Sequence, residues 1–75
     1  MTNEELKMII GNNIKKYRKK NGLTQDELAS LIGCTTALIG ALESSKMCQG
    51  VSVYNLYKIS RVLNVSIDKL FKDVI

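Results

Sequence analysis

The residues of this sequence with the clearest chemical potential are its cations. Eleven lysine and arginine residues oppose seven aspartate and glutamate residues, for a net charge of +4 and an isoelectric point near 9.2. Lys15, Lys16, Lys19 and Lys20 fall together on one face of an expected helix. Such a cluster suits binding to a polyanion, and a solvated helix surface explains it equally well.

The sequence contains few of the residue types and motifs that catalysis uses. Histidine is absent, the carboxylates are scattered singly, and no Gly-rich phosphate loop or nucleophile elbow is present. Two cysteines alone do not make a zinc ligand set. The sequence therefore predicts no enzyme, no catalytic residue, no metal site and no cofactor.

The cysteines and the hydropathy bear on the compartment. Cys34 and Cys48 could form one disulfide, but the sequence shows no leader and no 18-residue apolar run. We interpret both as reduced thiols, Cys34 as a small core residue and Cys48 as a loop residue. We expect a cytoplasmic protein, bacterial or phage-encoded, with no membrane segment and no small-molecule ligand.

Apolar residues recur every three or four positions between Gly and Asn residues, and this spacing predicts five helices in one all-α domain spanning 1–75. Capping boxes open the first helix at Thr2 and the second at Thr24. Gly22 and Gly33 can adopt the left-handed conformation that ends each of them. The third helix is capped by Thr35 or Thr36 and runs to about residue 44.

Two more helices complete the predicted domain. Ser52 caps the fourth, which Asn64 closes, and Ser66 caps a short fifth that continues through Leu70 and Phe71. The inward residues expected on the fourth helix are Val53, Leu56, Ile59, Val62 and Leu63.

The stretch from residue 25 to residue 44 has the features of two helices that cross steeply over a tight turn. Ala29 is small enough for a close crossing, and Gly33 can adopt the positive φ that such a turn needs. Ile39 and Leu42 face inward from the second helix of the pair. The rest of the inward set is Leu28, Ile32 and Cys34.

A family resemblance rests on these residues. Residues 23–29 (LTQDELA), followed by Gly33, Ile39, Leu42 and Glu43, resemble the phage repressor/Cro (Cro/cI-type, Xre-like) family. The likeness extends from about residue 10 to the LNVSIDKLF run at residues 63–71. It implies a five-helix bundle of the lambda-repressor-like type with a helix-turn-helix motif at about 24–44, and an ion pair between Arg18 and Glu43.

The resemblance also implies a binding site, because this family lays its second helix across the DNA backbone and its third in the major groove. The base-facing positions it implies are Thr36, Ala37, Gly40 and Ala41. The phosphate-facing positions are Thr24, Gln25, Thr35, Ser44, Lys46, Lys15 and Lys19. The structural positions are Arg18, Ala29, Gly33, Ile39, Leu42 and Glu43.

The third helix departs from what a base-reading helix usually carries, since Arg, Lys, Asn and Gln are all absent from it. In one interpretation, short side chains allow close approach and alanine methyls meet thymine methyls, which would favour A·T pairs. In the other, this apolar helix contacts a protein, as in an antitoxin or anti-repressor.

The leading hypothesis is sequence-specific binding to double-stranded DNA by a small repressor-like transcriptional regulator. It would act as a homodimer on a palindromic operator. The apolar residues expected to pair the two copies lie at the C-terminal end: Leu70, Phe71, Val74 and Ile75. The alternative is that they pack into the core of their own chain, since the resemblance places Leu70 and Phe71 at core positions.

Overall fold

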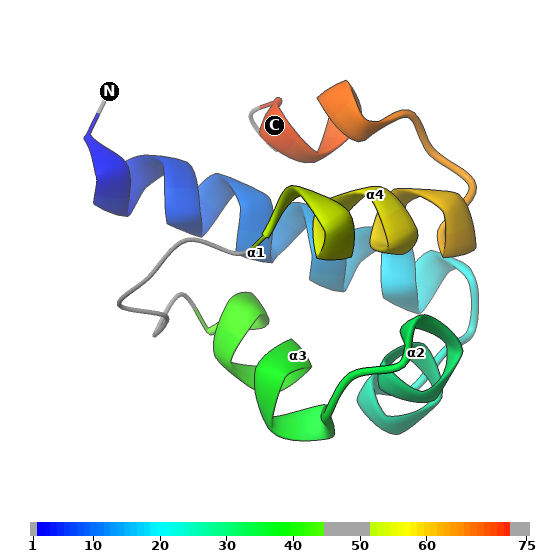
Figure 1. Ribbon diagram of the computed structural model, residues 1–75. Coiled ribbons are helices and arrows are strands. Elements are labelled where there is room, and N and C mark those ends of the chain that lie inside the picture. Colours follow the sequence, from blue (N-terminus) through cyan, green and yellow to red (C-terminus); the bar gives the residue numbers. More distant parts are fainter. Residues whose placement is uncertain (1, 45–51, 73–75) are drawn as a thin grey trace.

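The computed structural model describes residues 2–44 and 52–72. In these ranges the chain forms four α-helices and one 3-10 helix: α1 (Asn3–Lys20), α2 (Gln25–Ile32), α3 (Thr36–Glu43), α4 (Val53–Val62) and η1 (Ile67–Phe71). Helix α1 packs against α3 and η1, α2 packs against α3 and α4, and α4 also contacts η1. Figure 1 shows α2 and α3 together on one side of the molecule, with η1 on the opposite side of α1.

The fold confirms the predicted all-α class but corrects the type of its last element. Residues 67–71 form a 3-10 helix rather than a fifth α-helix. The segment has only five residues, and the Ser66 side chain makes no capping hydrogen bond. Without a side-chain cap, so short a segment is typical of the tighter 3-10 turn.

Threonine or serine caps begin the four described α-helices, as the sequence predicts, with Ser52 accepting the Asn55 N–H at the start of α4. The predicted cap at Ser66 is wrong. The Thr2 and Thr24 hydroxyls each accept the backbone N–H three residues later at 3.1 Å. Glutamates at those third positions complete both capping boxes. Of the two candidates for α3, Thr35 is the cap, and its hydroxyl accepts the Leu38 N–H at 3.2 Å.

The core is a continuous cluster of aliphatic side chains contributed by every element. Its fully buried members are Ile14, Leu28, Ile39, Ile59, Leu63 and Leu70. The prediction that Val53 faces inward is wrong, because this residue, in the first turn of α4, is 76% exposed. Burial along α4 begins one turn later, at Leu56.

A buried amide joins the C-terminal segment to α1. The Asn13 side chain is 2% exposed, and its Nδ2 donates to the Leu70 carbonyl at 2.9 Å and to the Lys72 carbonyl at 2.6 Å. These bonds satisfy a polar group that would otherwise be costly to bury. They hold η1 along α1 and fix the backbone of residues 70–72 beside the core, in which Leu70 is buried.

This packing corrects the expected pairing surface. Leu70 is completely buried in its own chain, so it is not available to a second copy. Phe71 is 39% exposed. Val74, Ile75, Lys46 and Cys48 lie outside the described residues.

Two other features of the described residues concern the Cys34 thiol and the character of the helices. Cys34 is a free, half-buried thiol packed against the core, and burial raises its pKa. No described helix combines the length and the apolar character needed to cross a bilayer.

Candidate nucleic-acid interface

Helices α2 and α3 meet at a short turn whose shape depends on one glycine. Gly33 ends α2 with φ +77°. A Cβ built on Gly33 would meet no atom of residues 2–44 or 52–72 within 4 Å, so the backbone conformation rather than lack of space requires glycine there. The Cys34 N–H then donates to the Ala29 carbonyl at 2.9 Å, and α3 begins two residues later. The turn thus fixes the direction in which α3 leaves α2 (Figure 1).

A buried ion pair between α1 and α3 stabilises the angle between α2 and α3. Arg18 on α1 donates from Nε to Glu43 Oε2 at 2.6 Å and from Nη2 to Glu43 Oε1 at 3.0 Å. The Arg18 and Glu43 side chains are 10% and 4% exposed, and hydrogen bonding to Glu43 raises the pKa of the guanidinium. Arg18 Nη1 also donates to the Leu23 carbonyl at 2.7 Å. The predicted Arg18–Glu43 pair is therefore confirmed, and it ties α1 both to α3 and to the entrance of α2.

Gln25 joins the same network. Its Nε2 donates to Glu43 Oε1 at 3.1 Å, which holds a half-buried amide between α2 and α3. A Cβ added to Gly40 would lie 3.7 Å from Gln25 Oε1, an ordinary van der Waals distance. The fold therefore positions Gln25 across Gly40, and it does not itself require that residue 40 lack a side chain.

The four predicted base-facing positions divide into two pairs. Thr36 and Ala37 are exposed at the start of α3, whereas Gly40 and Ala41 are half-buried one turn later. The Thr36 hydroxyl donates to Asp26 Oδ1 on α2. Sequence reasoning missed Asp26, because nothing in the spacing of residues 26 and 36 indicates that two helices bring them together.

The predicted phosphate-facing residues vary in what they can still offer a ligand. The Thr24 and Thr35 hydroxyls accept capping N–H groups, so each keeps its own proton to donate. Ser44 instead donates to the Ala41 carbonyl at 3.3 Å, which leaves it only as an acceptor. Lys15 and Lys19 are exposed on α1.

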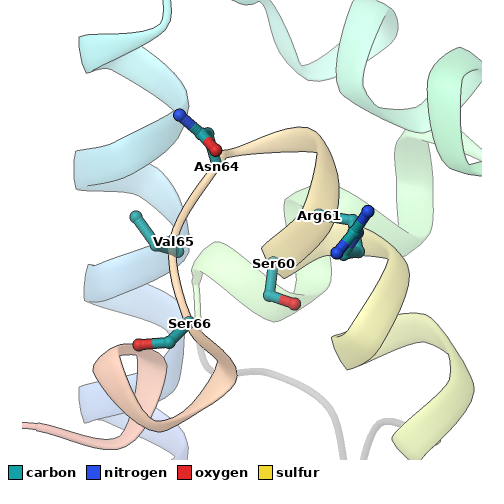
Figure 2. Close-up of a pocket in the computed structure, with 5 residues that line it drawn as sticks. All are labelled: Ser60, Arg61, Asn64, Val65 and Ser66. Atoms are coloured by element: carbon teal, nitrogen blue, oxygen red, sulfur yellow. The ribbon is translucent and has the colours of Figure 1, made fainter.

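A hollow of about 310 Å³ lies where α4 turns towards η1, lined by Ser60, Arg61, Asn64, Val65 and Ser66. Figure 2 shows these side chains diverging, with the Arg61 guanidinium directed away from Val65 and Ser66. The Ser60 hydroxyl already donates to the Tyr57 carbonyl at 2.7 Å. The lining thus offers no convergent set of polar groups of the kind that small-molecule sites use. In residues 2–44 and 52–72 no group of His, Cys, Asp and Glu could hold a metal ion.

Known proteins match this chain along most of its length. The control protein C.MunI from a Mycoplasma species is 35% identical over 71 residues, covering 93% of each chain. The crystal structure of the restriction-modification controller protein C.AhdI from Aeromonas hydrophila has a TM-score of 0.79 and 28% identity, covering 87% of this chain and 96% of that one. The N-terminal DNA-binding domain of SinR from Bacillus subtilis has a TM-score of 0.80 and 33% identity, covering 88% and 94%.

A family model for helix-turn-helix proteins matches residues 14–70. That range takes in the second half of α1, the α2–turn–α3 unit, α4 and most of η1. It contains both members of the Arg18–Glu43 pair and the left-handed Gly33. The chain belongs to the helix-turn-helix family, as the Cro/cI-type resemblance in its sequence predicts.

Proposed function

We propose that this protein regulates transcription by sequence-specific binding of double-stranded DNA, with α3 in the major groove. The observation that carries the proposal is the α2–turn–α3 unit, held at a fixed angle by the Arg18–Glu43 pair and Gln25. A rigid unit of this kind positions a recognition helix without ordering it at the moment of binding. Controller proteins such as C.MunI and C.AhdI, which match over nearly their whole length, favour a regulator of that type.

The proposed contacts follow from what the described side chains still offer. The start of α2 and the start of α3 each present a threonine hydroxyl with a free proton, Thr24 and Thr35. Hydroxyls and helix N-termini are common phosphate contacts. Lys15 and Lys19 add charge that holds the backbone without reading its sequence. Base contact then falls to Thr36, Ala37, Gly40 and Ala41.

Short side chains on α3 make methyl contact the expected form of readout. Ala37 and Ala41 lie one turn apart on the same side of the helix. Thymine carries the only methyl group in the major groove, so these positions favour A·T pairs. The supporting observation is the exposure of Ala37 and the partial exposure of Ala41.

We place pairing of two copies on α4 rather than on Leu70. Three neighbouring side chains there are strongly exposed: Val53 at 76%, Tyr54 at 75% and Tyr57 at 53%. The Lys58 ammonium lies 5.3 Å from the centre of the Tyr54 ring. Exposed apolar and aromatic side chains on one helix of so small a protein suit a contact site, and a palindromic operator requires two copies.

Selection from random duplex oligonucleotides at a stated salt concentration tests the function. We expect a palindrome with an A·T-rich half-site. Ala37→Gln should abolish enrichment of that sequence, whereas Ser30→Gln, at an exposed position on α2, should not. Replacing thymine by uracil at contacted steps deletes only the methyl, and affinity should fall at one or two steps per half-site.

Failure of these tests would favour the other candidate, in which apolar α3 contacts a protein. If no duplex is enriched, and if the bound fraction of mixed DNA hardly responds to salt, phosphate contact is not driving the association. Helix α3 would then be assigned to a protein partner.

Sedimentation tests the pairing surface separately. Tyr54→Ser should shift the protein towards monomer, because it removes exposed aromatic area from α4. Leu31→Ser is the matched control, since Leu31 is 60% exposed on α2. A dimer that survives Tyr54→Ser but not Leu31→Ser would move the interface to α2.

A further inference from the structure

Asp26 and Thr36 form a polar pair at the N-terminal ends of α2 and α3. Asp26 is the second residue of α2, Thr36 is the first residue of α3, and both are exposed. The Thr36 Oγ1 donates to Asp26 Oδ1. An ionised carboxylate has no proton to give, so the hydroxyl proton must lie between these two oxygens.

This bond determines how Thr36 can act towards a ligand. A free threonine hydroxyl can donate or accept, and it therefore tolerates either kind of partner. With its proton directed to Asp26, the Thr36 oxygen offers only lone pairs. The carboxylate beside it likewise offers only lone pairs, so together they form an acceptor-only patch at the start of α3.

We propose that the Asp26–Thr36 pair reads an exocyclic amino group in the major groove, so that this position selects adenine or cytosine over guanine or thymine on the contacted strand. Adenine N6 and cytosine N4 are the donors there, whereas guanine O6 and thymine O4 are acceptors. A guanine O6 or thymine O4 facing the pair would either be repelled by the two acceptor oxygens or draw the Thr36 proton away from Asp26. In the second case the carboxylate would be left unpaired in a dehydrated interface, which is costly. The inference rests on the proposed placement of α3 in the groove and adds a second kind of readout to the alanine methyls.

The negative charge of Asp26 has a further effect on selectivity. It lies in the first turn of α2, near the proposed phosphate contact of Thr24, and repels the backbone of every duplex equally. An amino group at the matching base offsets that repulsion only on the correct sequence. Asp26 thus weakens binding to all DNA while widening the gap between matching and mismatching sites.

The test compares two charge-removing variants in the same turn of α2. Asp26→Asn keeps the shape but replaces one carboxylate oxygen by an amide N–H, so that the pair is no longer made of acceptors alone. Glu27→Gln removes the same charge yet keeps an oxygen to accept the Thr24 N–H, which Glu27 Oε1 accepts at 2.8 Å. Each protein is titrated against duplexes that carry every single substitution in the selected half-site, at one salt concentration, after a thermal melt has shown that it is folded.

We expect the wild-type protein to prefer an amino base over a keto base about ten-fold at one position per half-site. In Asp26→Asn this preference should approach unity while the preferences elsewhere persist. In Glu27→Gln affinity should rise for all duplexes in parallel, with the preference retained. Thr36→Val, which has the same shape without the hydroxyl, should also lose the preference and serves if Asp26→Asn does not fold.

Two results would overturn the inference. If Asp26→Asn shifts all affinities in parallel, as Glu27→Gln does, the pair does not read a base although α3 still does. If the wild-type protein prefers no duplex at all, the proposed function itself fails and this inference fails with it.

Discussion

Gly40→Ala should change the stability of the fold and the affinity for DNA in opposite directions. Gly40 lies inside α3, where glycine is unfavourable relative to alanine by about 1 kcal/mol. It is not among the glycines with positive φ. Alanine therefore fits its backbone without strain, and among the described residues an added methyl would meet only Gln25 Oε1, at 3.7 Å.

The magnitude follows from these facts. With no clash to subtract, Gly40→Ala should raise the free energy of unfolding by about 0.5–1 kcal/mol, since alanine also restricts the unfolded chain. For a domain of this size a gain of 1 kcal/mol raises Tm by roughly 4–8 °C. If α3 approaches the base edges at residue 40, the same methyl should weaken operator binding by about ten-fold, the cost of forcing one methyl into a packed contact.

Thermal melts and operator titrations measure the two effects on the same samples. Ser30→Ala is the matched control, because it also places alanine inside a helix, here at an exposed position on α2. It should stabilise by a few tenths of a kcal/mol without touching DNA. A fall in Tm for Gly40→Ala would refute the reasoning about space around residue 40. A rise in Tm with unchanged operator affinity would remove residue 40 from the interface.

Three further predictions concern the ion pair, the lysines and the thiol. Truncating Glu43 or Arg18 alone should lower the free energy of unfolding by roughly 3–5 kcal/mol, because a buried charge is left unpaired. A double-mutant cycle from urea melts should show strong coupling between the two residues, and additive losses would contradict a buried pair. Lys15→Gln and Lys19→Gln should each lower the slope of log affinity against log salt by about one unit without changing base preference, whereas an unchanged slope would place the lysine off the backbone. Cys34 should react with iodoacetamide more slowly than an unstructured cysteine peptide at pH 8, because its raised pKa leaves less thiolate; equal rates would contradict the burial.

Local signals account for most of what the sequence could predict. The caps at Thr2 and Thr24 depend on hydrogen bonds within three residues, and Gly33 is identified by the conformation that only glycine adopts easily. The apolar spacing likewise locates Ile14 and Ile39 in the core. Such features need no knowledge of the rest of the chain.

Errors arose where contacts between distant segments decide the outcome. Val53 and Leu56 lie on the same face of α4, but the apolar periodicity does not indicate at which residue of α4 the packing against other elements begins. Asn13 is an ordinary polar residue in the sequence, and only its position beside Leu70 explains its burial. At the candidate site, the family pattern located Thr36 but not Asp26, since that bond depends on the angle between α2 and α3.

The anchoring of Leu70 and Lys72 by Asn13 has a consequence for synthesis of the protein. Helix α1 is made before the other described helices, yet its buried amide finds both partners only in residues 70–72. A growing chain therefore has an open core until those residues have left the ribosome, however early its helices form. Ribosomes that stall before residue 70 would release fragments with exposed aliphatic surface, which proteases remove readily. Synthesis past residue 72 thereby decides whether this domain can close its core.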